Sequence, residues 1–264
     1  MTERIEDGVD SLKNRGAHPP FFQSFPEVAT PVTVLHEDDL ILVVNKPAGR
    51  LAQPDRTGDA DVLSLATERL RRAGAADPFV GLVHRLDRPT SGLMVLARTS
   101  AAARHLSEQF RERTVQKRYL AVVEGELRGI GTWRDYVAKP GRQPKIVPPD
   151  HSDGKPAVLE WQALARTEET TLLQVELRTG RPHQIRLQAA ERTVPVVGDV
   201  RYGAAGTGPP EGIALHHALL RIDRPGTARR ATFVASVPDS WAPFLTDEMR
   251  AAIERMLARA QPHE

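Results

Sequence analysis

The feature that most constrains the fold is a charged turn enclosed by two apolar runs. The runs are residues 80–83 and 93–97, and the turn between them reads HRLDRPTSG. No buried strand could continue through this segment, because Pro89 fixes φ and Gly92 permits a positive φ. The turn must therefore be displayed, with Asp87 surrounded by basic side chains, namely His84, Arg85 and Arg88. An aspartate on a turn commonly forms an Asx turn or a cap, so this stretch alone leaves both a structural and a chemical role for Asp87 open.

Length and composition predict one folded domain. The chain has 264 residues, of which 40% are hydrophobic, and this is enough to build a sizeable core. Residues 1–30 combine charges and prolines without periodicity, so we expect a mobile N-terminal arm followed by a single domain of residues 31–264. No apolar run approaches the length of a membrane span, and the N-terminus lacks the apolar core of a signal peptide. We therefore expect a cytoplasmic protein that does not associate with membranes.

The sequence shows no spacing of residues that is typical of a metal site. The chain contains no cysteine, which excludes disulfides, thiolate nucleophiles and cysteine-bound zinc. Its nine histidines show no HExxH spacing. We therefore expect no catalytic metal.

Arginine dominates the basic residues, with thirty Arg and six Lys. Arginine binds phosphate through paired hydrogen bonds, which suits an RNA partner, although a GC-rich genome would produce the same bias. Two segments concentrate positive charge, residues 98–118 and residues 134–145. Each segment is either a solvated surface or a stripe that follows phosphates.

Periodicity predicts an α+β fold. Strands are expected at residues 32–35, 40–45, 117–125, 158–164, 172–177 and 231–237. Helices are expected over residues 61–72 with Asp61 as the cap, after Ser100, after Pro182 and over residues 249–257. Residues 126–156 are rich in Gly and Pro and are expected to form a basic excursion between strands. These elements predict a mixed, mostly antiparallel β-sheet with flanking helices.

Basic side chains gather where the helix after Pro182 begins, in the sequence TGRPHQIR. A helix N-terminus already carries partial positive charge, so cations there do not favour stability. Arg181, His183 and Arg186 therefore indicate anion binding.

Four separated stretches now share this character: LVVNKPAG, HRLDRPTSG, KRYLAVVEG, and TGRPHQIR with the following GDVRYG. Together they resemble the RluA family of pseudouridine synthases, over about residues 32–238. The resemblance implies a catalytic domain with a central RNA-binding cleft that isomerises uridine to pseudouridine in structured RNA. It implies that Asp87 is the catalytic nucleophile, that Tyr119 stacks on the target base, and that Arg181 pairs with the aspartate.

The same resemblance implies how RNA is held. Arg85 matches a residue that enters the RNA where the flipped base was, and Lys46 lies in the first motif. Further RNA contacts are expected from basic residues beside these motifs, namely His84, Arg88, Lys117, Arg118, His183 and Arg186. The expected partner is a stem-loop of ribosomal or transfer RNA, bound by a monomer without a cofactor.

Two departures from the family pattern concern peripheral features. Gln53 and Pro54 stand where many relatives have His-Pro. We also expect no separate RNA-binding domain before the first motif. Two other functions are weighed against the enzyme: an RNA-binding protein without activity, and a metal-dependent hydrolase that uses Asp87 with His84, Asp199 or Glu124. A carboxylate inside a basic cleft opposes phosphate binding, so Asp87 favours the enzyme.

Overall fold

The computed structural model describes residues 3–5, 31–139, 141, 143–227 and 229–260. Its strands are β1 (Glu3–Ile5), β2 (Val32–Glu37), β3 (Ile41–Lys46), β4 (Gly81–Leu82), β5 (Ser91–Ala97), β6 (Gln116–Glu124), β7 (Ile130–Ala138), β8 (Lys145–Val147), β9 (Lys155–Arg166), β10 (Thr170–Leu177), β11 (Leu215–Asp223) and β12 (Arg230–Val234). Its helices are α1 (Val62–Arg72), α2 (Ser100–Glu112), α3 (Gln184–Ala190) and α4 (Asp247–Ala258), with short 3₁₀ helices η1 (Val200–Tyr202) and η2 (Asp239–Phe244). Apart from β1, which pairs with β2, the arm predicted for residues 1–30 lies outside the described residues.

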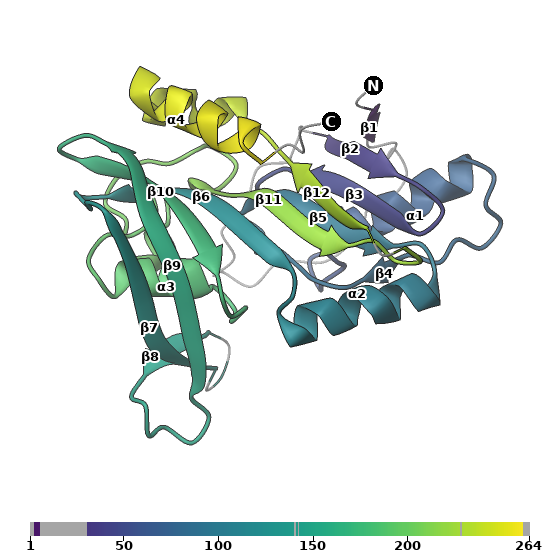
Figure 1. The fold of residues 1–264 in the computed structure, drawn as a ribbon, viewed down its shortest axis with the longest axis horizontal. Coiled ribbons are helices and arrows are strands. Elements are labelled where there is room, and N and C mark those ends of the chain that lie inside the picture. The colour runs from purple at the N-terminus through teal and green to yellow at the C-terminus, as the bar shows by residue number, and fades with distance from the viewer. Residues whose placement is uncertain (1–2, 6–30, 140, 142, 228, 261–264) are drawn as a thin grey trace.

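One sheet connects all the strands, in the order β1-β2-β3-β5-β11-β6-β10-β9-β7-β8, with β12 beside β11 and β4 beside β5. Among the described strands only β5 and β11 pair in parallel, so the prediction of a mixed, mostly antiparallel sheet is confirmed. In Figure 1, α2 lies along the lower side of the sheet and α4 along the upper side. The contacts agree, because α2 packs on β4, β5 and β11 whereas α4 packs on β9.

The first two helices begin at side-chain caps. The Asp61 carboxylate accepts from the backbone N–H of Ser64, as predicted. The second cap is Thr99 rather than Ser100, because the Thr99 hydroxyl accepts from the N–H of Ala102 and Ser100 is already helical. Both residue types cap well, and Thr99 directly precedes Ser100 in the chain.

The predicted excursion at residues 126–156 is wrong in its middle, where β7 and β8 continue the sheet. These strands lie at the sheet edge and bury only part of one face, so their apolar alternation is weak. Gly131 is required in β7, because a Cβ there would lie 2.6 Å from the Trp161 ring on the neighbouring strand. The Gly- and Pro-rich composition of residues 126–156, which predicted a loop, therefore belongs in part to the antiparallel pair β7 and β8 at the sheet edge.

The central strand β11 was not predicted from the sequence. His216 and His217 are both fully buried in it and interrupt its apolar pattern. Each is held by β5, because His216 Nδ1 lies 2.8 Å from Ser91 Oγ and His217 Nδ1 lies 2.7 Å from the Leu93 carbonyl oxygen. At the same point a Cβ on Gly92 would lie 2.4 Å from the His217 carbonyl oxygen, so only glycine fits. These contacts fix the strand that leaves the Asp87 turn.

Within the part of the chain described here, none of the helices is long and apolar enough to span a membrane.

Candidate active site

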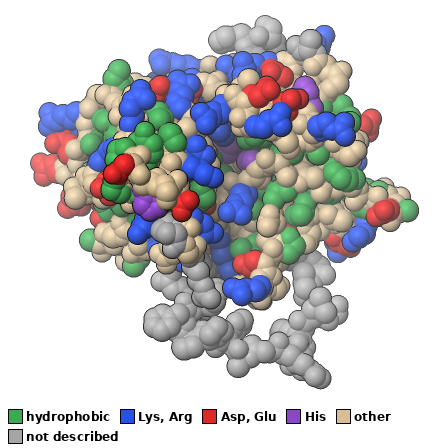
Figure 2. Space-filling view, turned by 90° about the horizontal axis from the view of Figure 1, so that it is seen from below, with side chains coloured by type: hydrophobic (Ala, Val, Ile, Leu, Met, Phe, Trp, Pro, Cys, Tyr) green, Lys and Arg blue, Asp and Glu red, His purple; other side chains and the backbone are tan. Residues whose placement is uncertain are grey.

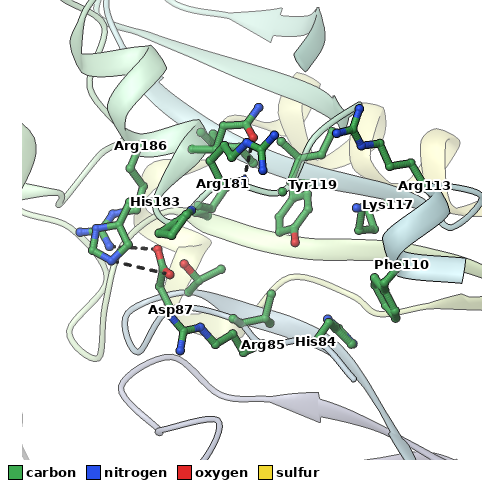
Figure 3. Close-up of a pocket in the computed structure, with 18 of the residues that line it drawn as sticks. His84, Arg85, Asp87, Phe110, Arg113, Lys117, Tyr119, Arg181, His183 and Arg186 are labelled. Carbon is green, nitrogen blue, oxygen red and sulfur yellow. Dashed lines mark hydrogen bonds and ion pairs between the residues drawn. The ribbon is translucent and has the colours of Figure 1, made fainter. Parts of the chain in front are cut away.

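A pocket of about 440 Å³ lies between four segments that are distant in sequence. Most of its lining comes from the turn at residues 83–90, the end of α2, the start of β6, and the loop that leads into α3 together with the first turn of that helix. Leu177 at the end of β10 and Leu215 at the start of β11 complete the lining. Figure 2 shows the face hollowed in the middle, with Lys and Arg side chains along the walls of the hollow. Figure 3 shows Asp87 at one end of the pocket and Lys117 with Arg113 toward the other.

The Asp87 turn is tied to the rest of the fold through its backbone. The Asp87 carbonyl accepts from the N–H of Thr90 at 3.1 Å, and the next carbonyl, of Arg88, accepts from the N–H of Gly49 at 2.8 Å. The Asp87 side chain is only 24% exposed, and its carboxylate faces Arg186 and His183. Its partners therefore come from a different segment of the chain, which a turn cap does not require.

Arg186 holds two carboxylates at once. Its Nε and Nη2 donate to the Asp199 carboxylate at 2.6 and 2.9 Å, and its Nη1 donates to Asp87 Oδ2 at 3.1 Å. Burial alone would lower the pKa of Arg186, but the hydrogen bonds and charges of Asp199 and Asp87 raise it. The guanidinium is 4% exposed and lies 4.9 Å from the centre of the Tyr202 ring. A permanently charged group is thus fixed beside Asp87.

The predicted ion pair between Arg181 and Asp87 does not form. Arg181 lies in the loop before α3, where its Nε donates to the Pro156 carbonyl at 2.9 Å and its backbone N–H donates to Gln184 Oε1 at 3.0 Å. Arg186 lies within α3 and points toward Asp87 (Figure 3). The motif contains both arginines, and only the position at which the helix starts distinguishes them.

Tyr119 projects into the pocket from β6. Its ring stacks on His217 with the ring centres 4.5 Å apart and an angle of 15° between planes. Burial and the nearby Asp87 charge raise the pKa of the Tyr119 phenol, so the hydroxyl keeps its proton at neutral pH. The residue is 7% exposed and rigidly supported on one face by the histidine.

His84 also lines the pocket but serves as a support. Its Nε2 accepts from the N–H of Val95 at 3.0 Å, and its ring stacks on Phe110 at 4.7 Å. Burial lowers the pKa of His84 to about 3, with a smaller contribution from Lys117 in the same direction. The ring is therefore neutral and holds the turn against β5 and α2.

His183 and Tyr202 lie beside the carboxylate. His183 Nδ1 lies 2.7 Å from the Tyr202 hydroxyl, and His183 Nε2 lies 3.8 Å from Asp87 Oδ1. Burial lowers the pKa of His183, although the Asp87 charge opposes this shift. No role was predicted for Tyr202 from the sequence, and Asp199 was weighed only as a metal ligand. Both residues lie in GDVRYG, one of the stretches on which the family resemblance rests.

Lys46 does not reach the pocket, contrary to the prediction of an RNA contact. It is fully buried, and its Nζ donates to the carbonyls of Pro47, Arg50 and Arg88 at 3.0, 2.8 and 3.2 Å. Burial lowers the pKa of Lys46 to about 7, while the Asp87 charge opposes the shift. Lys46 thus joins the first motif to the turn that carries Asp87.

Two further residues predicted to contact RNA lie outside the pocket lining. Arg88 Nε donates to the Gly49 carbonyl at 2.8 Å, and its Nη1 pairs with Asp59 at 2.7 Å. Arg118 Nε pairs with Glu176 at 3.1 Å. Side chains alternate along a strand, so Arg118 faces away from the side that Lys117 and Tyr119 share.

Arg85 and Lys117, which were predicted to contact RNA, both line the pocket. Arg85 is exposed, and Lys117 Nζ lies 5.8 Å from the centre of the Phe110 ring. Both cations are available on the pocket side of the molecule.

The residues weighed for a metal-dependent hydrolase do not converge. Asp199 is engaged by Arg186, and the Glu124 carboxylate accepts from the N–H groups of Ala205 and Gly206. Among the residues that the structure describes, no group of three or more His, Cys, Asp or Glu side chains could hold a metal ion.

Comparison with known proteins gives a consistent result. Residues 40–191 match a sequence family described as RNA pseudouridylate synthase. A "ribosomal large subunit pseudouridine synthase D" of Xylella fastidiosa is 34% identical over 250 residues, which cover 87% of this chain and 75% of that protein. An uncharacterised RNA pseudouridine synthase of Synechocystis is 34% identical over 219 residues, covering 79% of this chain and 66% of the other.

Solved structures show the same fold. The human RNA pseudouridylate synthase domain containing 4 superposes with a TM-score of 0.67 at 21% identity, over 84% of this chain and 92% of that one. The human domain containing 1 superposes with a TM-score of 0.66 at 22% identity, over 88% and 96%. The segments that carry Asp87, Tyr119 and Arg186 lie within the family match, whereas Asp199 and Tyr202 follow it.

Proposed function

Because this chain belongs to the RNA pseudouridylate synthase family and is an RNA pseudouridine synthase of the RluA type, we propose that Asp87 is its catalytic nucleophile. The observation that carries this assignment is the arrangement around its carboxylate. Arg186 is anchored on buried Asp199 through Nε and Nη2 and directs Nη1 toward Asp87. A permanently charged group therefore lies at hydrogen-bond distance from the Asp87 carboxylate and holds that carboxylate in position.

The reaction needs only one carboxylate. Hydrolysis of a glycosidic bond normally uses two, one as acid and one as base or nucleophile. In the isomerisation, the bond from uracil N1 to ribose C1′ breaks and a bond from C5 to C1′ forms. The C5 hydrogen leaves as a proton, and N1 gains a proton. Because the uracil stays in the pocket, the same Asp87 can serve the departure and the recapture.

Tyr119 is proposed to act on the base. The pocket side of its ring supplies a stacking surface, since His217 supports the opposite side. Its hydroxyl is protonated, so it acts as a relay that accepts the C5 proton while passing on its own. Arg85 is proposed to occupy the place in the RNA that the flipped base leaves, at a flipping cost of a few kcal/mol.

The proposed substrate is a stem-loop of ribosomal or transfer RNA. Several relatives are named for the large ribosomal subunit, which supports ribosomal RNA. The pocket volume of about 440 Å³ is suited to one flipped nucleotide rather than to a duplex. We propose that the protein works as a monomer in the cytoplasm, where these RNAs are modified.

The test is release of tritium from RNA labelled at uridine C5. The wild-type protein should release tritium from unmodified large-subunit ribosomal RNA or transfer RNA transcripts without added metal or nucleotide. Chelator should leave the rate unchanged, and the RNA should stay intact. Activity lost in chelator, or cleavage of the RNA chain, would instead support the hydrolase.

A further inference from the structure

Three cations from different segments meet at the part of the pocket away from the Asp87 carboxylate. Arg113 follows α2, Lys117 lies near the start of β6, and Arg181 precedes α3, and all three line the pocket. Figure 3 shows Arg113 and Lys117 beyond Tyr119, with Arg181 on the same wall. Burial lowers the pKa of both Lys117 and Arg181, and the Arg113 charge lowers each further, so Arg113 lies within electrostatic range of the other two cations.

None of the three cations pairs with a carboxylate among the described residues. Arg181 Nε donates to the Pro156 carbonyl, and Lys117 Nζ lies 5.8 Å from the centre of the Phe110 ring. The neighbouring Arg111, by contrast, pairs with Glu108 at 2.9 Å. Positive charges gathered without a counter-charge repel one another and cost stability, so the arrangement is suited to an anion that arrives with the substrate.

The backbone of Arg113 supports the same conclusion. Arg113 ends α2 in the left-handed conformation, with φ 62° and ψ 30°. Glycine is the usual residue there, because a Cβ makes this conformation unfavourable. An arginine at such a position costs stability in the free protein, and its side chain extends over the pocket, where it gains nothing from an internal carboxylate.

We propose that Arg113, Lys117 and Arg181 form a subsite for a backbone phosphate of the substrate RNA, next to the nucleotide whose base lies against Tyr119. A phosphate fits because guanidinium groups bind its oxygens through paired hydrogen bonds. Contacts to phosphate set the register of an RNA without reading its sequence. This inference rests on the proposed function, and it moves Arg181 from the chemical step to the positioning of the RNA.

The test uses Arg113→Gly, because glycine removes the guanidinium and relieves the backbone. Lys117→Met and Arg181→Gln probe the other two members, and Arg255→Gln, an exposed arginine on α4, is the matched control. The probe is an unmodified large-subunit ribosomal RNA transcript, used for equilibrium binding over a salt series and for tritium release.

Arg113→Gly should keep or raise the melting temperature. For RNA binding by this variant, the slope of log K against the logarithm of the salt concentration should become shallower by about 0.7 to 0.9, the contribution of one phosphate contact. We expect KM to rise about tenfold while kcat stays within about twofold, and Arg255→Gln to behave as wild type. An unchanged slope and KM in Arg113→Gly would overturn the subsite, as would an equal loss in Arg255→Gln, which would indicate general attraction by net charge.

This outcome is separable from failure of the proposed function. If the wild-type protein releases no tritium from any RNA tested, the assignment of the active site fails regardless of the salt slopes. If the wild type is active and the Arg113→Gly protein matches it in KM and slope, only the subsite fails.

Discussion

The two ends of the pocket treat positive charge in opposite ways. At one end, buried Arg186 faces two carboxylates, Asp87 and Asp199, at hydrogen-bond distance. At the other end, Arg113, Lys117 and Arg181 face the pocket with no carboxylate partner among the described residues. A charge matched inside the protein is fixed in geometry and screened little by salt, whereas unmatched charges depend on a partner and on ionic strength. The first end is thus suited to chemistry and the second to holding RNA.

The largest expected effect is at the matched end. Asp87→Asn should abolish tritium release, because the amide cannot act as a nucleophile. RNA affinity should stay within about tenfold, or about 1.4 kcal/mol, since the phosphate contacts lie elsewhere. Tritium release measures the first effect and equilibrium binding measures the second, both with the same transcript. If binding is lost together with activity in a folded protein, Asp87 is needed for RNA binding and the division between the two ends is wrong.

The two arginines of one motif provide the next test. Arg186→Lys should lower kcat by about 10²-fold, because one ammonium cannot hold Asp199 through two bonds and also reach Asp87. Arg186→Met should lower the free energy of unfolding by about 3 to 5 kcal/mol, because it leaves Asp199 buried without its partner. Arg181→Gln should weaken RNA binding and spare kcat. Steady-state kinetics and urea unfolding distinguish these outcomes, and an equal loss of kcat in Arg181→Gln would return the catalytic ion pair to Arg181.

Tyr119 lies between the two ends and should show both behaviours. Tyr119→Phe keeps the stacking ring, so RNA affinity should persist, while product formation falls by about 10²-fold through loss of the hydroxyl. Tyr119→Ala should lose stacking as well, which is worth about 1 to 3 kcal/mol per base. Single-turnover assays that follow breakage of the bond between uracil N1 and ribose C1′, and separately release of the C5 proton, locate the blocked step. A Phe variant with the wild-type rate would make Tyr119 a stacking surface alone.

The smallest expected effect on activity concerns Lys46, a buried cation whose hydrogen-bond partners are carbonyls. Its pKa is lowered to about 7 in the folded protein, against a usual value of 10.5. Between these values the unfolded chain binds more protons, so the contribution of Lys46 to stability rises with pH, by at most about 1.4 kcal/mol per pH unit, and is constant below pH 7.

Lys46→Met removes this dependence and leaves carbonyl oxygens without their donor. The free energy of unfolding should therefore be lower in the variant, and the difference from wild type should widen as pH rises from 7 to 10. Urea unfolding at several pH values measures the difference, with Arg255→Gln as the control. If the difference in free energy of unfolding stays constant with pH, Lys46 keeps its proton in the folded protein over this range and its pKa is not lowered by burial.

Much of the local structure was predictable. The cap and apolar stripe of α1, the apolar stripe of α4, the apolar runs beside the Asp87 turn and the display of the turn itself follow from patterns within a few residues. The edge strands β7 and β8 were not predictable in this way, because partial burial at a sheet edge leaves weak alternation. The central strand β11 was missed because two buried histidines interrupt its apolar run, and their partners lie more than 120 residues away in β5.

The sequence by itself determined which motifs are present: the family they resemble, the turn that displays Asp87, and a tyrosine on the strand that follows. Only the tertiary structure decided which arginine meets Asp87, because Arg186 and Asp87 are 99 residues apart and Arg181 lies in the same motif. It also decided that Lys46 is buried beneath the Asp87 turn and that Arg113 shares a pocket wall with Arg181. Local patterns report propensity and periodicity, whereas the pairing of charges depends on which segments the sheet brings together, and no short window of sequence contains that information.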